Sequence, residues 1–235
     1  KARERLMGQM INELTKSARQ RILAGNFDAA RQLLEMAART DSGCRDFAAY
    51  LLLQGKLEEE TSRRAEALAQ HTDEAEARLL GYLLRAQGDL PAALRVFDQQ
   101  AVSPDLARGV LVELGDWNEL ARRIDETLPA AGEPLDENIT DRDAVLEGLA
   151  ASAAFHHLAG NEAQSDAACK RLDEAATDNP DEAPYVAKAM LIAGRLDEGI
   201  RRFSELDDRR AAFDLLVAQM RFDDAFQVAG MDGPR

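Results

Sequence analysis

The chain lacks several features that common classes of protein require. Its 235 residues include only two cysteines, Cys44 and Cys169, and 5% of them are aromatic. Two cysteines so far apart in sequence exclude a disulfide framework and a cysteine-rich zinc site, so we expect two buried thiols. No stretch approaches the roughly 18 apolar residues of a membrane-spanning helix, so we predict no insertion into a membrane. Aromatic residues favour strands, and their scarcity indicates a helical protein.

The sequence also lacks the motifs that hold cofactors and perform catalysis. No glycines are spaced as in phosphate-binding loops, and there is no His-Glu-x-x-His motif. His156 and His157 are adjacent, so on a helix they point about 100° apart and cannot chelate one metal together as residues i and i+4 can. We expect His157 to pack against the protein or to line a groove. We therefore predict that the chain is not an enzyme and holds no metal and no cofactor.

Charged residues are plentiful, but the two signs are unevenly distributed. The formal net charge is −14, whereas residues 1–39 contain eight Lys or Arg against four Asp or Glu. Most of such a chain repels a polyanion, so we predict that DNA and RNA are not partners. The chain begins with Lys1 rather than Met, and we therefore expect it to be a piece of a longer protein.

A glycine-centred phrase returns along the chain. It reads Ala-Gly-Asn-Phe-Asp-Ala-Ala around Gly25 and Gln-Gly-Asp-Leu-Pro-Ala-Ala around Gly88. The glycines of the series are Gly25, Gly55, Gly88, Gly115, Gly160 and Gly194, at intervals of 30, 33, 27, 45 and 34 residues. Intervals of this length are typical of arrays of helix pairs. Glycine commonly ends a helix in the left-handed conformation, and the Asp or Asn that often follows it can cap the next helix.

Apolar residues recur at helical spacing between these glycines and predict fourteen helices, hence seven antiparallel pairs. We expect helices near 3–24, after Gly25, and near 44–54, 57–70, 73–87, 90–101, 105–114, 117–127, 141–159, 162–176, 182–193, 196–206, 209–219 and 222–229. Prolines and acidic residues in the long interval predict an exposed loop. We therefore expect helical repeats in residues 1–128 (about four pairs), an acidic loop in 129–142 and further repeats in 143–235 (about three pairs).

The segment around Gly88 resembles a tetratricopeptide repeat. That family places a small residue in the first helix of a pair, here Gly81, and a glycine in the turn, here Gly88. A small residue follows in the second helix, here Ala93, then a large apolar residue, here Phe97, and a closing proline, here Pro104. Small residues let the two helices approach closely, and the large residue fills the space toward the next pair.

Other copies of this pattern are less complete. The copy around Gly194 matches well, but Glu60 and Leu120 stand where the copies around Gly55 and Gly115 should have a small residue. The last pair lacks the turn glycine. The resemblance implies an all-α solenoid of about seven antiparallel helix pairs, wound as a right-handed superhelix. A related helical-hairpin solenoid, such as the arms of coat-like proteins, stays open as an alternative.

One row of residues suggests a binding site. Arg78, Tyr82 and Arg85 share a helix face because they are spaced i, i+4 and i+7. In the family that the chain resembles, the first helix of each pair lines the concave surface, and the equivalent positions of earlier repeats are Arg45 and Arg19. We predict that this row binds an acidic or carboxylate-bearing segment of a partner protein through forked arginine hydrogen bonds. The alternative is that these arginines pair within their own helices, for instance Arg78 with Glu74.

These observations favour a non-catalytic protein–protein interaction scaffold that binds a partner peptide or helix in its concave groove. The alternative is an architectural solenoid arm of a larger multidomain protein.

Overall fold

In a computed structural model the chain is built from α-helices. The structure describes residues 2–71, 73–100, 102–130, 142–177, 183–205 and 209–230, and this part of the chain contains fourteen helices and no strand. The predicted all-α solenoid of stacked helix pairs is therefore confirmed. The helices begin and end within a few residues of the predicted limits, because apolar periodicity and turn residues are both local signals.

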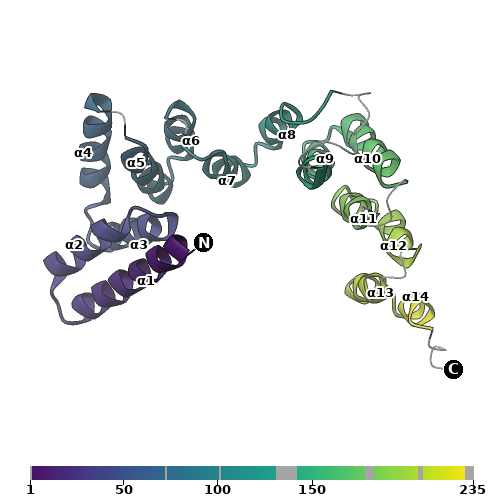
Figure 1. Cartoon of the computed structure of the whole chain (residues 1–235), viewed down its shortest axis with the longest axis horizontal. Coiled ribbons are helices and arrows are strands. Elements are labelled where there is room, and N and C mark those ends of the chain that lie inside the picture. Colours follow the sequence, from purple (N-terminus) through teal and green to yellow (C-terminus); the bar gives the residue numbers. More distant parts are fainter. Residues whose placement is uncertain are drawn as a thin grey trace. The chain divides into compact units, whose positions relative to one another are not determined.

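The chain divides into two compact units, Lys1–Gly115 and Asp116–Arg235 (Figure 1). The helices of the first unit are α1 (Ala2–Leu23), α2 (Phe27–Ala37), α3 (Asp41–Leu53), α4 (Leu57–Gln70), α5 (Glu74–Gln87), α6 (Leu90–Gln99) and α7 (Pro104–Leu114). Those of the second unit are α8 (Trp117–Asp125), α9 (Arg142–Leu158), α10 (Glu162–Thr177), α11 (Ala183–Ile192), α12 (Leu196–Glu205), α13 (Arg209–Ala218) and α14 (Phe222–Val228).

Each unit stacks its helices in chain order. In the first unit α1 packs on α2, α2 on α3, α3 on α5, α5 on α6 and α6 on α7. In the second unit α8 packs on α9, α9 on α10 and α11, α11 on α12, α12 on α13 and α13 on α14. Each pair therefore shelters its apolar side against the next pair, as a solenoid requires.

The two units meet at Gly115, whereas the predicted arrangement of repeats in 1–128 and 143–235 around an acidic loop in 129–142 stays a prediction. Helices α7 and α8, expected to form one pair, belong to different units. Helix α8 is tied to α9: the Trp117 and Phe155 rings stack with centroids 6.3 Å apart, and Asp125 bonds to side chains of α9. Residues 131–141 of the predicted acidic loop lie outside the described residues.

The turns follow the predicted chemistry. Gly88 has φ 82°, and Asp89 accepts a hydrogen bond from the Ala92 backbone N–H at 3.1 Å. In the last pair, which lacks the glycine, Met220 takes the left-handed position with φ 57°. Its neighbour Arg221 donates from its backbone N–H to the Leu216 carbonyl at 2.8 Å. The hairpin geometry therefore survives without glycine, at the cost of a strained residue.

Close helix approach explains the small residues of the best repeat. A Cβ atom on Gly81 would overlap the ring of Phe97, so only glycine lets α5 lie against α6 here. Phe97 and Ala93 are fully buried in the core of the first unit. This close packing explains why the pattern around Gly88 combines small residues with a large apolar one.

Helix α4 departs from the apolar pattern because it buries charges. Glu60, where a small residue was expected, is 3% exposed, and Arg64 is 7% exposed. Glu60 accepts hydrogen bonds from Arg31 of α2 at 2.7 Å and from Arg64 at 2.8 Å. Arg64 also donates to both carboxylate oxygens of Glu76 on α5, at 2.6 and 2.7 Å, and pairs with Glu35 of α2. A buried charged cluster thus links α2, α4 and α5.

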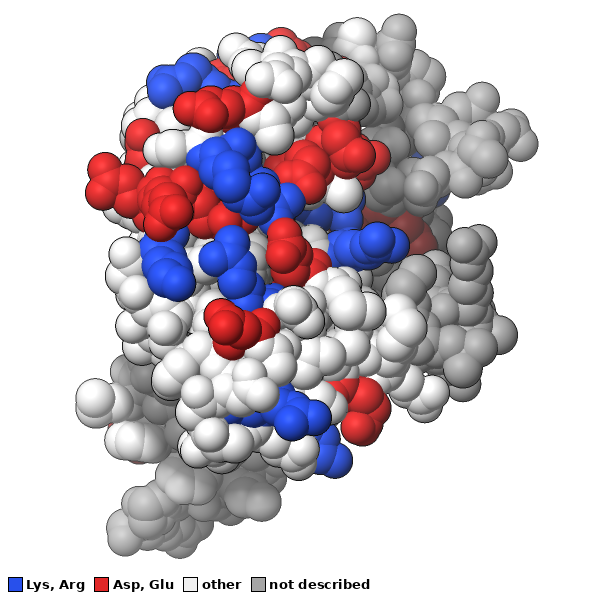
Figure 2. Space-filling view, turned by 90° about the vertical axis from the view of Figure 1, so that its left-hand side faces the viewer, with Lys and Arg blue, Asp and Glu red and all other residues white. Residues whose placement is uncertain are grey.

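The charged cluster is the buried part of a mixed surface. On the side of the first unit where α2 and α4 lie, acidic and basic side chains alternate rather than form a patch of one sign (Figure 2). Burial alone would raise the pKa of Glu60, but hydrogen bonds and charges from Arg63 and Arg64 lower it to about 2. Glu60 is therefore ionised at neutral pH and compensates the buried arginine.

Candidate functional site

A groove of about 510 Å³ lies on the first unit over α3, α5 and α7. We call it the Arg45 groove. The side chains that give it its character are Arg45, Leu52, Tyr82, Arg85, Asp105 and Glu113. Its walls come from α3, α5 and α7, which in the predicted pairing are the first helices of successive pairs.

Tyr82 is the centre of the groove. Its ring is 5% exposed and meets Phe97 edge-on, with centroids 6.4 Å apart and an interplanar angle of 71°. The guanidinium carbons of Arg45 and Arg85 lie 5.9 and 5.4 Å from the ring centroid, within the range of cation–π attraction. Burial raises the pKa of Tyr82, and the charge of Asp41 adds to the effect. The ring is therefore a neutral platform that holds two cations in place.

The arginines around this ring differ in their partners. Arg85 pairs with Glu113 of α7. Arg78 donates to Glu74 at 2.7 Å and lies 3.7 Å from Asp41, so the expected alternative of pairing within the helix is confirmed for this residue. Among the ion pairs of the described residues, Arg45 has no carboxylate partner. Arg45 contacts Tyr82 instead, with its guanidinium over the ring.

Arg19 lies apart from the other members of the predicted row. It is exposed on α1 and lines a separate pocket of about 330 Å³ with Lys16, Ser42 and Asp46. The structure therefore brings Arg45, Tyr82 and Arg85 together, leaves Arg78 engaged beside them, and places Arg19 at a different pocket.

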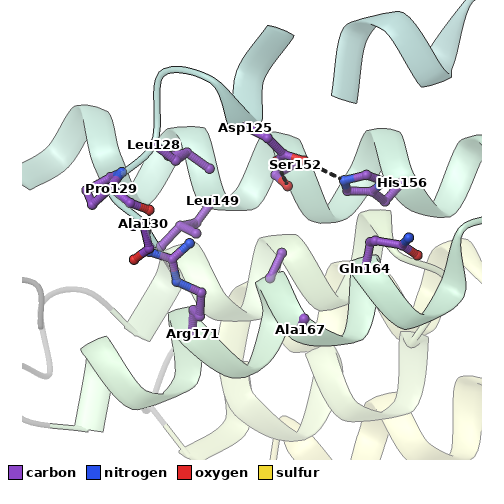
Figure 3. A pocket seen from close by; sticks show the side chains of 11 residues that line it. Asp125, Leu128, Pro129, Ala130, Leu149, Ser152, His156, Gln164, Ala167 and Arg171 are labelled. Carbon is purple, nitrogen blue, oxygen red and sulfur yellow. Dashed lines mark hydrogen bonds and ion pairs between the residues drawn. The ribbon is translucent and has the colours of Figure 1, made fainter. Parts of the chain in front are cut away.

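A second pocket, of about 300 Å³, lies between α8, α9 and α10 of the second unit (Figure 3). We call it the Asp125 pocket. Ser152 Oγ donates to Asp125 Oδ1 at 2.6 Å, and His156 Nε2 donates to Asp125 Oδ2 at 2.8 Å. Sequence reasoning missed this group. The signal was present, because Ser152 and His156 are spaced i and i+4 and so share a helix face, but their acidic partner comes from another helix.

The geometry of the Asp125 pocket differs from that of a serine hydrolase. In such an enzyme the histidine lies between the serine and the aspartate and takes the serine proton. Here Asp125 lies between the other two and accepts from both, and Ser152 is 3% exposed. The arrangement orients a carboxylate and joins α8 to α9. It does not activate a nucleophile.

The other residues considered for chemistry have structural surroundings. His157 is half-buried, with Nδ1 3.1 Å from Glu162 Oε1, and its ring lies beside the turn at Gly194. Both cysteines are buried, as expected, and burial raises the pKa of Cys44 to about 12 and of Cys169 to about 11. Neither is a reactive thiolate at neutral pH.

The described ranges contain neither a group of side chains that could hold a metal ion nor a helix that could span a membrane. No three side chains of His, Cys, Asp or Glu there are grouped to hold a metal ion. No helix in that part of the chain is long and apolar enough to cross a membrane.

Comparison with known proteins finds a likeness among solved structures. No family model matches the chain, and no curated protein matches it. A tetratricopeptide repeat protein from Parabacteroides merdae ATCC 43184 is similar in crystal structure, with a TM-score of 0.39 and 15% sequence identity over 97% of this chain and 94% of that one. These figures do not assign the chain to a family.

Proposed function

We propose that the chain is a non-catalytic interaction scaffold and that the Arg45 groove binds a segment of a partner protein. One observation carries this proposal: the guanidinium of Arg45 lies over the Tyr82 ring, in a groove, with no carboxylate partner among the described residues. Arginine forms forked hydrogen bonds with carboxylates and stacks on aromatic rings. A carboxylate of the partner therefore has a prepared site.

The rest of the groove limits the kind of segment that fits. Asp41, Asp105 and Glu113 also line it, so a run of acidic residues would be repelled. Leu52 is 57% exposed and offers an apolar surface. A segment with one carboxylate beside an apolar side chain, such as a chain terminus, satisfies both conditions.

Arg78 and Arg19 belong to the proposal as outer members of the row. Arg78 lies beside Asp41 and so offsets the negative charge of that residue. Arg19 lines the neighbouring pocket on α1, where a longer segment would continue. Both are expected to contribute less than Arg45, because Arg78 already has acidic partners and Arg19 lines a different pocket.

The direct test is a peptide selection followed by one substitution. A displayed library of random peptides with free C-terminal carboxylates is selected on the whole chain, and the affinity of the recovered peptides is measured by fluorescence anisotropy. Arg45→Glu should weaken binding at least about tenfold, since a charge-assisted hydrogen bond is replaced by repulsion.

The matched control is Arg95→Glu, which makes the same charge change at an exposed position of α6 outside the groove. It should leave the affinity nearly unchanged. Equal affinities for the wild-type chain and Arg45→Glu would remove the groove from the proposal.

A second function, that of an architectural arm, is favoured by the hairpin tips. Large apolar residues two positions before the turn glycine are exposed: Leu23 by 88%, Leu53 by 82%, Leu158 by 49% and Ile192 by 53%. Exposed apolar side chains that recur at these turns suit packing on a further domain. If further domains were joined to this chain, hydrogen exchange at these turns should be slower than in the 235-residue chain alone. Equal exchange would count against this second function.

A further inference from the structure

The second unit of the molecule is strongly acidic. Residues 116–235 contain 13 Lys or Arg against 26 Asp or Glu, a net charge of −13. Such a unit attracts positively charged ligands from a distance and concentrates them at its surface. The Arg45 groove belongs to the other unit, so a cation-binding site here would be independent of it.

The Asp125 pocket holds a carboxylate in a fixed orientation. The side chain of Asp125 is 44% exposed, yet Ser152 and His156 each donate a hydrogen bond to one of its oxygens. A carboxylate has about four acceptor sites, so two remain after these bonds are made. An ammonium or guanidinium group that enters the pocket therefore meets a pre-oriented acceptor and spends little entropy in ordering it.

The walls of the Asp125 pocket suit the aliphatic part of a long basic side chain. Leu128, Leu149 and Ala168 line it, and its volume of about 300 Å³ leaves room for one long side chain. Lysine and arginine bury their methylene groups along apolar surface while the charged end stays hydrogen-bonded.

One cation already lines the pocket, and its position matters. Arg171 donates to the backbone carbonyls of Pro129 and Ala130 at 3.0 and 3.4 Å. Figure 3 places Arg171 with these two residues at one end of the pocket, and Asp125 with His156 toward the other. The charge of Arg171 is thus directed toward carbonyl oxygens, and the Asp125 end is left for a ligand.

We propose that the Asp125 pocket binds a lysine or arginine side chain of a partner protein, with the cation hydrogen-bonded to Asp125 and its methylene groups against Leu128 and Leu149. The acidic charge of the second unit attracts the basic side chain, and the pocket determines where that side chain binds. The scaffold then holds two segments of opposite charge, one on each unit.

The experiment titrates the 15N-labelled chain with acetylated and amidated tripeptides and follows the amide resonances by NMR. The probes are Ala-Lys-Ala and Ala-Arg-Ala, with Ala-Gln-Ala and Ala-Glu-Ala as neutral and acidic controls. The basic probes should shift the resonances of Asp125, Ser152 and Gln164 and should bind at least about tenfold more tightly than the neutral probe.

Two variants test the pocket in different ways. Asp125→Asn removes the charge, and Ala167→Leu fills the pocket from an exposed position of α10 while Asp125 stays in place. Each should lower the affinity for the basic probes at least about tenfold. Glu147→Gln removes one acidic charge from an exposed position of α9 outside the pocket and should change it by less than about twofold.

Several results would overturn the proposal. These are equal binding of the neutral probe, preferred binding of the acidic probe, or unchanged affinity in Ala167→Leu, whose fold is checked by circular dichroism. Resonance shifts confined to surfaces away from α8, α9 and α10 would also overturn it. None of these results affects the Arg45 groove, which is tested with other peptides and on another unit.

Discussion

The two units share one architecture and differ in charge. Both are built from helix pairs whose turns contain a residue in the left-handed conformation. Residues 1–115 contain 16 Lys or Arg against 17 Asp or Glu, whereas residues 116–235 contain 13 Lys or Arg against 26 Asp or Glu. The first unit places part of its balanced charge inside, around Glu60 and Arg64. The apolar spacing that determines how the pairs stack therefore does not fix the charge that the helices carry.

The largest expected effect comes from the charged cluster of the first unit. Arg64→Ala removes the arginine that Glu60 and Glu76 share. Glu60, which is buried, then keeps only Arg31 and Arg63 as partners. Loss of one member of a buried ion pair costs about 3 kcal/mol or more. Urea unfolding followed by circular dichroism should show the loss as a lower midpoint for the first unit.

Arg122→Ala in the second unit is the matched control. Arg122 also pairs with two carboxylates, Glu119 and Glu126, but it lies at the surface. Its removal should leave the midpoint unchanged. Similar losses in both variants would contradict the distinction between buried and exposed charge that separates the units.

A somewhat smaller loss is expected where α5 and α6 approach closely. Gly81→Ala places a methyl group in the Phe97 ring and should cost about 2 kcal/mol, because the ring must move from a filled core. Gly109→Ala on α7 meets no atom within 4 Å and should stabilise its helix slightly. Thermal unfolding of both variants measures the difference. A stable Gly81→Ala variant would show that the repeat pattern has another cause.

Acid should weaken the first unit through Glu60. Its pKa is lowered from 4.5 to about 2 in the folded chain, so the unfolded chain binds more protons between these values. The stability that Glu60 contributes is therefore present above pH 4.5 and is lost as the pH falls toward 2. Urea midpoints measured across this range should fall less steeply for Glu60→Gln than for the wild-type chain. Parallel curves would show that other carboxylates dominate.

The smallest effect concerns the turn that lacks glycine. Met220→Gly relieves a left-handed backbone and should stabilise the α13–α14 pair by about 1 kcal/mol, reduced by the greater freedom of glycine in the unfolded chain. Hydrogen exchange of the amides of α13 and α14 should slow. Gly194→Ala places a Cβ atom on a left-handed residue at the equivalent turn, where φ is 76°, and should therefore speed exchange in α11 and α12. If both variants exchange like the wild-type chain, a positive φ in a residue with a side chain does not destabilise these turns.

Most of the fold could be predicted from the sequence, because its signals are local. Gly88, Asp89 and Pro91 lie next to one another and specify a helix end and a helix start without reference to the rest of the chain. The pattern of Gly81 and Phe97 also lies within one pair, so their contact could be anticipated.

The candidate sites could be predicted only in part. Arg45, Tyr82 and Arg85 were expected to lie together because equivalent positions of stacked repeats share a surface, and they do. Glu113 of α7 pairs with Arg85 and not with Arg45. Glu113 lies about 30 positions from Arg85 and about 70 from Arg45 in the sequence, so local spacing could not predict which arginine it engages. The group of Asp125, Ser152 and His156 was not predicted either, because Asp125 and His156 come from different helices.

Neighbouring residues settle where each helix begins, where it ends and which side of it is apolar, through backbone conformation and capping. Packing between distant residues settles the division of the chain at Gly115, the burial of the Glu60 charge and the grouping of Asp125 with Ser152 and His156. These depend on which distant charge or ring becomes a neighbour. That choice is made by the balance of desolvation and pairing after the helices have packed.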